Sequence, residues 1–167
     1  LSSAEIGVTL DRQLRDLLCL AYGQPAAAVF DLRRYYHEPP QWHWTMRDGA
    51  GRLMAHAAVH DKTLGTPQGD IEAAGIGEVC VHPNYRGRGY LRQLLAAMHA
   101  DLEKGPALFA ILMGNPQIYT SSGYVLVNNK FLYRDGEHGN WREEHFDHAM
   151  VRAFSERPWP QGRIDLR

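Results

Sequence analysis

The residues best suited to chemistry gather in one stretch, VCVHPNYRGRGYLRQLL, which covers 79–95. Gly87 and Gly89 stand directly before an apolar pattern of helical spacing. Glycine allows positive φ and lets a ligand approach the backbone amides closely, and a helix start adds partial positive charge. Arg86 and Arg88 add donors that suit phosphate oxygens. We therefore expect this loop to bind a phosphate group; the alternative is a plain basic turn between a strand and a helix.

The strand pattern that ends at His82 sorts its side chains onto two faces. A period of two places Glu78, Cys80 and His82 on one face, and Val79 and Val81 on the other. We expect the valines to pack on the core beneath the following helix. The three polar side chains would then face an open side of the sheet, where a substrate could sit.

Glu78 is the candidate general base on that face. A strand carboxylate beside a ligand loop accepts a proton from an ammonium group, directly or through water, and the alternative is a carboxylate paired with a neighbouring arginine or histidine. The imidazole of His82 also suits proton transfer but stands closer to the loop, whereas Asp70 and Glu72 suit the binding of a cationic substrate. Cys80 could form an acyl-enzyme, but a small buried strand residue is the favoured interpretation.

Nine histidines raise the question of a metal site. The spacing of His145 and His148 fits no standard zinc pattern, and both lie in a segment without regular periodicity. The acidic side chains around them are interleaved with Arg134 and Arg142, which is typical of a solvated surface. We expect no metal.

Two helices and a hairpin are predicted ahead of the glycine loop. Leucines at helical spacing predict a helix over 10–22, and a second helix is expected over 26–36. Alternation with a period of two on both sides of Asp48-Gly49 predicts a hairpin. Residues 61–70 are polar, with two glycines and a proline, and indicate a loop before a strand over 72–81.

After the glycine loop, one more helix is predicted up to Leu102, because Gly105-Pro106 would end it. The tail from 130 is less regular in its pattern. Further strands are predicted over 108–113, 125–127, 149–154 and 163–166. This order of elements predicts an α/β or α+β fold, in which a mixed sheet is flanked by helices within a single domain covering 1–167.

The stretch 79–95 resembles the acetyl-CoA-binding motif of the GNAT superfamily of N-acetyltransferases. That motif, hydrophobic-x-V-x-P-x-x-R-G-x-G, runs from a strand into a helix, and Leu91 departs from the small residue that is commoner just after it. The resemblance implies that the loop amides hold the pyrophosphate of coenzyme A, and that the amide of Val81 or Cys80 polarises the thioester carbonyl. The matching positions are Val79, Val81, Pro83, Arg86, Gly87 and Gly89.

A second segment, ILMGNPQIYTSSGYV at 111–125, resembles the part of the same family that ends in Tyr-x-x-x-Gly-aromatic. Tyr119, Gly123 and Tyr124 fit it. The resemblance implies that Tyr119 protonates the departing thiolate; the alternative is an aromatic core residue whose hydroxyl finds a partner. Asn115 in this segment is assigned to the cofactor-binding residues as well. The expected cofactor-binding set is Val79, Cys80, Val81, Arg86, Gly87, Arg88, Gly89, Tyr90 and Asn115.

Together the two motifs imply a GNAT-like, mostly antiparallel central sheet that splays at the cofactor site. They also imply direct transfer of the acetyl group of acetyl-CoA to a primary amine of a small molecule or peptide, through a ternary complex. The segments 53–65 and 78–91 are similar to aminoglycoside 2'-N-acetyltransferases, so an aminoglycoside is one acceptor we consider. The alternative function is a non-catalytic acyl-CoA-binding or sensor module on the same fold.

Composition narrows the class of protein. The formal net charge of -1 gives no overall attraction to nucleic acid or to an anionic membrane. No apolar run approaches the roughly 20 residues that span a bilayer. Cys19 and Cys80 form no CxxC pair, so no disulfide framework is expected and a cytoplasmic location is favoured. The expected partner is the amine substrate, without nucleic acid or membrane, and a homodimer is left open.

Overall fold

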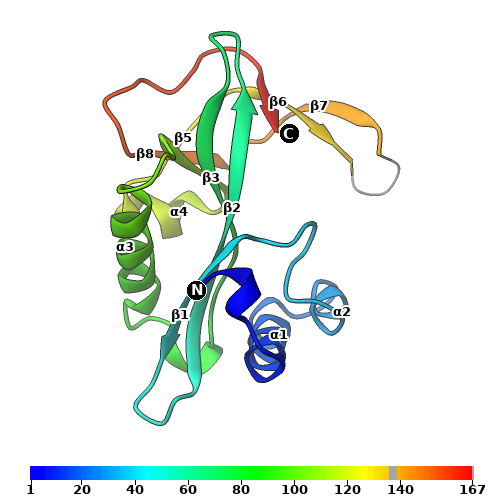
Figure 1. Ribbon diagram of the computed structural model, residues 1–167, viewed down its shortest axis with the longest axis vertical. Coiled ribbons are helices and arrows are strands. Elements are labelled where there is room, and N and C mark those ends of the chain that lie inside the picture. The colour runs from blue at the N-terminus through cyan, green and yellow to red at the C-terminus, as the bar shows by residue number, and fades with distance from the viewer. Residues whose placement is uncertain (136–138, 167) are drawn as a thin grey trace. The chain divides into compact units, whose positions relative to one another are not determined.

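The computed structural model describes residues 1–135 and 139–166, and the chain folds into two compact units (Figure 1). Unit 1 consists of residues 1–60 and 76–99, and unit 2 of residues 61–75 and 100–167. Two strands contribute residues to both units, namely β2 (Leu53–Gly65) and β3 (Ile71–Val81). The single domain expected over 1–167 stays a prediction.

Unit 1 begins with a short 3-10 turn, η1 (Ser3–Glu5), and the amphipathic helix α1 (Val8–Tyr22). The helix buries Leu14, Leu17 and Leu18, which recur at the spacing of one helical face. It ends at Gly23, which has a φ of 65° and donates its amide to the Cys19 carbonyl at 3.0 Å. The helix predicted over 10–22 is confirmed.

The second predicted helix is much shorter than expected, because α2 covers only Ala27–Phe30. The amide of Arg33 still bonds to the Val29 carbonyl at 3.1 Å, but after it the chain leaves the helical conformation. The Arg33 guanidinium donates to the carbonyls of Tyr35 and Tyr36 at 3.2 and 2.6 Å. The prediction of a helix over 26–36 was therefore wrong beyond the first turn.

The predicted hairpin is present as β1 (Trp42–Arg47) and the first half of β2, paired antiparallel from Trp42↔Val59 to Arg47↔Leu53. Its turn is closed by Asp48, whose Oδ1 accepts the amides of Ala50 and Arg52, each at 2.9 Å. β2 also continues into the predicted loop 61–70, as far as Gly65. That part pairs with the C-terminal strand β9 (Ile164–Leu166), so tertiary pairing overrides the polar sequence.

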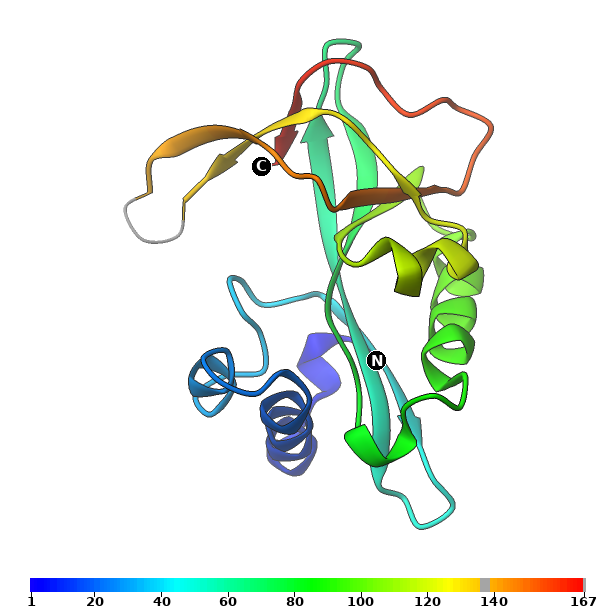
Figure 2. The same ribbon diagram turned by 180° about the vertical axis from the view of Figure 1, so that it is seen from behind.

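The glycine loop lies between β3 and the helix α3 (Tyr90–Leu102), with a 3-10 turn, η2 (Pro83–Tyr85), at its start. Within unit 1, α1 and α2 lie on one side of β2 and β3, and α3 lies on the other (Figures 1 and 2). The core between β3 and the first two helices contains Leu14, Leu17, Leu18, Phe30, Leu53 and Cys80.

Unit 2 is built on the sheet order β5-β8-β4-β3-β2-β9-β6-β7. Its remaining elements are β4 (Phe109–Met113), α4 (Pro116–Tyr119), η3 (Thr120–Ser122), β5 (Val125–Leu126), β6 (Lys130–Arg134), β7 (Trp141–His145) and β8 (Ala149–Ala153). The pairs β3–β4 and β6–β9 are parallel, and the pairs of β8 with β4 and β5, β2 with β9 and β6 with β7 are antiparallel. The predicted mixed, mostly antiparallel sheet flanked by helices is confirmed.

Strands β3 and β4 pair from Ala73↔Phe109 to Gly75↔Ile111. Strand β3 then runs on to Val81. The predicted splay of the sheet requires two neighbouring strands to stop pairing, and β3 and β4 stop pairing at this point.

The tail of unit 2 contains a hairpin that the sequence pattern did not indicate. β6 and β7 pair from Lys130↔His145 to Arg134↔Trp141 and extend away from β8 (Figure 2). All five residues of β7 are exposed, which explains why WREEH carries no alternation of apolar and polar residues. The strands predicted over 149–154 and 163–166 are present as β8 and β9.

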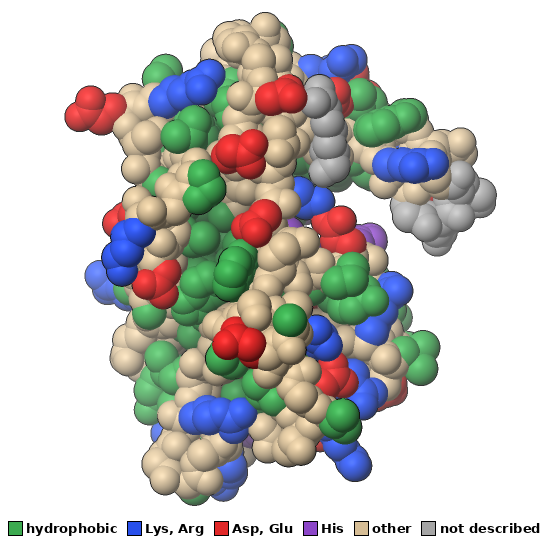
Figure 3. Space-filling model, in the orientation of Figure 1, with side chains coloured by type: hydrophobic (Ala, Val, Ile, Leu, Met, Phe, Trp, Pro, Cys, Tyr) green, Lys and Arg blue, Asp and Glu red, His purple; other side chains and the backbone are tan. Residues whose placement is uncertain are grey.

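Charged side chains are mixed in sign on the face of the molecule shown in Figure 3, where Lys and Arg alternate with Asp and Glu. This fits the near-zero formal net charge. No helix of residues 1–135 or 139–166 combines the length and the apolar character needed to cross a membrane.

Candidate active site

The glycine loop contains two residues whose backbone conformation favours glycine. Gly87 and Gly89 have φ values of 72° and 77°, in the left-handed region that favours glycine. A Cβ at either position would meet nothing within 4 Å, so conformation rather than crowding explains the two glycines. Helix α3 starts immediately afterwards, and the amides of its first turn have no intrahelical acceptor. The arrangement presents amides and a helix N-terminus to an anion.

Two side chains anchor this loop to the rest of unit 1. The Tyr85 hydroxyl donates to Asp48 Oδ2 at 2.7 Å, and this hydrogen bond is the main reason why the pKa of Asp48 is lowered. Arg86 donates through Nε to the Val81 carbonyl at 3.2 Å and through Nη2 to the Ala21 carbonyl at 2.9 Å. Arg86 thus braces the loop, whereas the Arg88 guanidinium lies 5.8 Å from the Tyr85 ring centroid; both side chains are exposed. Phosphate binding by either arginine stays a prediction.

The two faces of the strand before the loop are the reverse of those expected. Cys80 is 6% exposed and belongs to the unit 1 core, and Glu78 is also buried, whereas Val79 and Val81 are half-buried. The reason is that α1 and α2 cover the face that was expected to be open. Burial raises the pKa of Cys80 to about 12, which leaves its thiol protonated at neutral pH. A nucleophilic Cys80 is therefore disfavoured, as the sequence analysis expected.

Glu78 occupies an unusual position in β3, with a φ of 48°. A non-glycine residue pays a steric penalty in this region, so the surrounding contacts must hold it there. Its Oε1 accepts the amide of Tyr36 at 3.0 Å, and its Oε2 lies 3.3 Å from His60 Nε2. Its backbone carbonyl lies 3.0 Å from His56 Nδ1. Contacts from three residues, Tyr36 and two histidines of β2, thus fix both the carboxylate and the carbonyl of this residue.

His60 lies between the buried carboxylate of Glu78 and the exposed carboxylate of Glu38. Its Nε2 contacts Glu78, and its Nδ1 lies 3.7 Å from Glu38 Oε1. The side chains of His60 and Glu78 are 12% and 6% exposed, whereas that of Glu38 is 52% exposed. Gly77 leaves room for the ring, because a Cβ there would lie 3.2 Å from His60 Nε2. A buried carboxylate, an imidazole and an exposed carboxylate therefore follow one another.

The sequence analysis missed His56 and His60. The signal available was their spacing of four residues in the alternating segment LMAHAAVH, which places both on one face of a strand. His82, by contrast, caps the start of the loop, because its Nδ1 accepts a hydrogen bond from the Asn84 amide at 3.2 Å. Asp70 and Glu72 lie in unit 2, where Glu72 accepts the Thr63 hydroxyl at 3.1 Å.

The second motif forms the helical segment after β4 in unit 2. Asn115 caps α4, because its Oδ1 accepts the Gln117 amide at 2.9 Å. The Tyr119 ring packs edge-on against that of Tyr124 at 5.9 Å, and a Cβ on Gly114 would lie 2.5 Å from Tyr119 Cε2. These contacts fix the ring of Tyr119 against its neighbours in unit 2. The proposed roles of Tyr119 and Asn115 toward a cofactor stay predictions.

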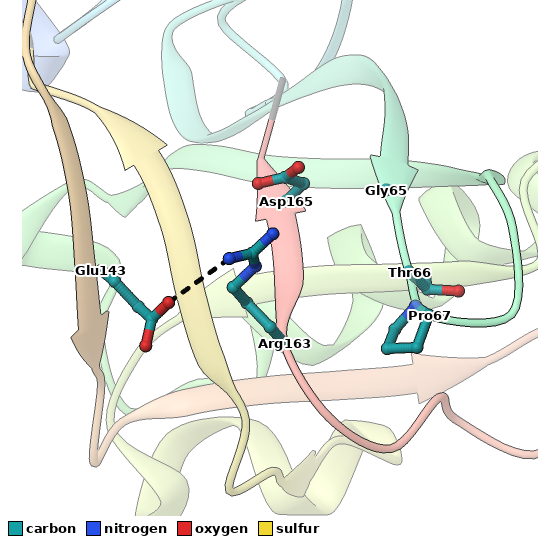
Figure 4. A pocket seen from close by; sticks show the side chains of 6 residues that line it. All are labelled: Gly65, Thr66, Pro67, Glu143, Arg163 and Asp165. Carbon is teal, nitrogen blue, oxygen red and sulfur yellow. Dashed lines mark ion pairs between the residues drawn. The ribbon is translucent and has the colours of Figure 1, made fainter.

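Unit 2 also contains two pockets that include none of the predicted site residues. One of about 570 Å³ has mixed charge and is lined by Gly65, Thr66, Pro67, Glu143, Arg163 and Asp165 (Figure 4). Arg163 Nη1 lies 3.6 Å from Glu143 Oε2 across this pocket. The other, of about 460 Å³, is lined by residues 126–130 together with Trp159, Gln161, Gly162 and Arg163. Within the described part of the chain, no group of three or more His, Cys, Asp or Glu side chains could hold a metal ion.

Comparison with known proteins identifies one family model that matches the chain and several solved structures with a similar fold. A family model described as an acetyltransferase (GNAT) domain matches residues 11–127. The structure is similar to the GNAT family N-acetyltransferase YhbS from Escherichia coli in complex with CoA, at 19% identity and a TM-score of 0.72, over 98% of this chain and 87% of that one. A GNAT family acetyltransferase from Brucella melitensis in complex with acetyl-CoA gives 16% identity and a TM-score of 0.66, over 97% and 92% of the two chains.

Escherichia coli ElaA is also similar, at 18% identity and a TM-score of 0.60, over 91% of this chain and 95% of that one. At these identities the likeness to solved structures shows the fold. A search of curated proteins finds no match.

Proposed function

We propose that this chain, which belongs to the GNAT acetyltransferase family, transfers the acetyl group of acetyl-CoA to a primary amine. The observation that carries the proposal is the loop from Pro83 to Tyr90, with two left-handed glycines at the start of α3. Such a loop suits the pyrophosphate of coenzyme A. The CoA and acetyl-CoA bound to two similar structures support the same co-substrate.

The reaction we propose is direct transfer within a ternary complex. The neutral amine nitrogen forms a bond to the thioester carbonyl carbon, and the bond from that carbon to sulfur breaks. The backbone amides around Val79 to Val81 would donate to the carbonyl oxygen as negative charge builds on it. The buried, protonated thiol of Cys80 supports direct transfer over an acyl-enzyme.

Glu78 is the proton acceptor in this proposal, with His60 as its partner. The incoming ammonium must lose a proton before it can attack, and the carboxylate of Glu78 would take it. The imidazole of His60 contacts Glu78 through Nε2, and it would pass that proton toward Glu38 once the 3.7 Å between Nδ1 and Glu38 Oε1 closes or a water molecule bridges it. The net reaction of an ammonium substrate then releases one proton to water for each acetyl group transferred.

Tyr119 is the proposed proton donor to the departing thiolate. A phenol is protonated at neutral pH and can protonate a thiolate as it leaves. The packing of its ring against Tyr124 supports a fixed orientation for the hydroxyl. A donor of this kind would lower the barrier to breaking the carbon–sulfur bond.

The acceptor is proposed to be a primary amine of a small molecule or peptide, and an aminoglycoside is one candidate. A test combines the protein with acetyl-CoA and a panel of polyamines, aminoglycosides, amino acids and peptides, and follows release of free thiol. We expect release above the rate of hydrolysis with at least one class. Absence of release with every class would count against catalysis.

One observation favours the alternative, a non-catalytic acyl-CoA-binding module. The Glu78 side chain is 6% exposed, and both of its oxygens already have partners. A substrate ammonium reaches this buried carboxylate only through the remaining lone pairs of its oxygens or after one of these contacts opens. Calorimetry that detects binding of acetyl-CoA, together with no thiol release across the panel, would select the module over the enzyme.

A further inference from the structure

A chain of hydrogen bonds runs through the interior of unit 1 and ends on the backbone of Glu78. Ser3 Oγ contacts His43 Nε2 at 2.8 Å, His43 Nδ1 contacts His56 Nε2 at 3.0 Å, and His56 Nδ1 contacts the Glu78 carbonyl at 3.0 Å. His43 and His56 are 1% and 0% exposed. The four residues come from η1, β1, β2 and β3, so the chain crosses the whole of this part of the sheet.

Both ends of this chain are acceptors. The hydroxyl of Ser3 is also in hydrogen-bond contact with the Pro40 carbonyl, and the far end is the Glu78 carbonyl. Four contacts therefore need four hydrogens. Burial lowers the pKa of His56 to about 4 and that of His43 to about 3, so both rings are neutral at pH 7. One hydroxyl and two neutral imidazoles supply only three hydrogens, and one contact is left without a hydrogen.

The position of the unfilled contact decides the tautomers. The Pro40 carbonyl can only accept, so the Ser3 hydroxyl donates to it. The contact between Ser3 Oγ and His43 Nε2 is part-buried, so water can serve both of these groups if that contact carries no hydrogen. The contact at Glu78 is buried, and there an unpaired carbonyl has no substitute. The hydrogens of the two rings therefore point toward Glu78. Ser3 Oγ donates to the Pro40 carbonyl, His43 donates through Nδ1 to His56 Nε2, and His56 donates through Nδ1 to the Glu78 carbonyl.

We infer that His56 is a positioning residue for Glu78, and that His43, by donating to His56 Nε2, fixes the tautomer in which His56 acts. This inference rests on the proposed role of Glu78 as proton acceptor. Glu78 has a left-handed backbone, so its carbonyl needs a partner of its own to stay there. Without the donor on His56, the residue relaxes toward extended backbone, which re-aims the carboxylate away from His60 and from the Tyr36 amide.

The test compares two substitutions of the same residue. Asn carries its side-chain amide where histidine carries Nδ1, so His56→Asn keeps a donor for the Glu78 carbonyl, whereas His56→Leu removes it. With acetyl-CoA and the best amine of the panel, we expect His56→Leu to lower kcat about 30-fold and His56→Asn to stay within about 3-fold of the wild type. The affinity for coenzyme A should change by less than about 3-fold in both, because the loop after Pro83 is not touched. Equal kcat for the two variants at equal stability overturns the inference.

A second measurement decides the matter if His56→Leu does not fold. Nitrogen NMR of the imidazoles in the wild-type protein at pH 7 reports which ring nitrogen carries hydrogen. We expect hydrogen on Nδ1 of both His56 and His43, and hydrogen on Nε2 of His56 overturns the inference. Failure of this inference can be told apart from failure of the proposed role of Glu78. An unchanged kcat in Glu78→Gln would remove the proton-acceptor role of Glu78, whereas the tautomer of His56 is measured without any turnover.

Discussion

Unit 1 holds its backbone in the left-handed region at two nearby places, by opposite means. At Gly87 and Gly89 the side chain is absent, and the space a Cβ would occupy is open. At Glu78 a charged side chain is present, and contacts from Tyr36, His56 and His60 hold it. The first solution is local, because glycine adopts this conformation without help. The second depends on segments distant in the sequence.

This difference indicates which substitutions would disturb each part of the site. The left-handed turns of the loop depend on the two glycines themselves, although Tyr85 and Arg86 anchor the loop as a whole. Glu78 loses its conformation if any of its supports is lost, including residues that would never touch a substrate. Strain that is held by several contacts is typical of functional sites. The following predictions, from the largest expected effect to the smallest, separate the two solutions.

Substitution of Glu78 by Gln is expected to have the largest effect. It keeps the size of the side chain and removes the proton acceptor, so kcat should fall about 1,000-fold, within the range typical of a lost general base. Steady-state kinetics with the best amine of the panel checks this, with the exposed Glu156→Gln as the matched control. A kcat within about 3-fold of the wild type would show that the contacts of Glu78 are only structural.

Acid should weaken the supports of Glu78 and leave the glycine turns unaffected. Burial lowers the pKa of His56 from 6.5 to about 4, so the unfolded state binds more protons between these values. The contribution of His56 to stability is complete above pH 6.5 and is lost as the pH falls toward 4, with a size on the order of 3 kcal/mol. Denaturant unfolding at pH 7 and pH 4.5 measures the loss. The His56→Asn variant, which has no imidazole at this position, should lose less, and an equal loss in both proteins would contradict the prediction.

Substitution of Gly89 by Val tests whether acetyl-CoA binding depends on the left-handed conformation that glycine provides in the loop. A β-branched residue cannot adopt a φ of 77° without strain, so the loop amides should turn away from the ligand. We expect the affinity for acetyl-CoA to fall about 100-fold, or about 2.7 kcal/mol. Calorimetry checks this, and Gly69→Val, at another open position of positive φ, is the control that carries similar strain outside the loop. Equal affinities for the wild type and Gly89→Val would remove the loop from the binding site.

Substitution of Tyr119 by Phe should have the smallest effect of the four. It removes one hydroxyl and keeps the ring contact with Tyr124. We expect kcat to fall about 10-fold, because water can replace a lost proton donor in part, while the affinity for acetyl-CoA stays unchanged. Single-turnover kinetics measures the step. A normal rate in Tyr119→Phe would assign the proton on the thiolate to another donor.

The comparison also shows which parts of the site could be predicted from sequence. The loop was predictable because the residues that define it are adjacent in the sequence, namely two glycines directly before a helical pattern. Glu78 was identified from its place in the strand, but its face was wrong, since a simple period of two does not include a left-handed residue or the helices that cover that side. His56 and His60 were missed because strand pairing brings them to Glu78, and pairing joins residues far apart in sequence.

The same distinction applies to the fold. Helix α1 and the β1–β2 hairpin followed from local periodicity and a turn signal. The end of β2 and the whole of β7 did not, because both are polar segments that become strands through their partners β9 and β6. Elements whose stability comes from tertiary pairing leave a weak signal in a single sequence.

The most direct test of the account is identification of the products. Incubation of the protein with acetyl-CoA and a primary amine, followed by mass spectrometry, should give free coenzyme A and an amine that carries an acetyl group on nitrogen, in equal amounts. Both should depend on Glu78 and on Gly89. Coenzyme A release without an acetylated amine, or acetyl-CoA that binds and remains intact with every amine, would contradict acetyl transfer as the function of this protein.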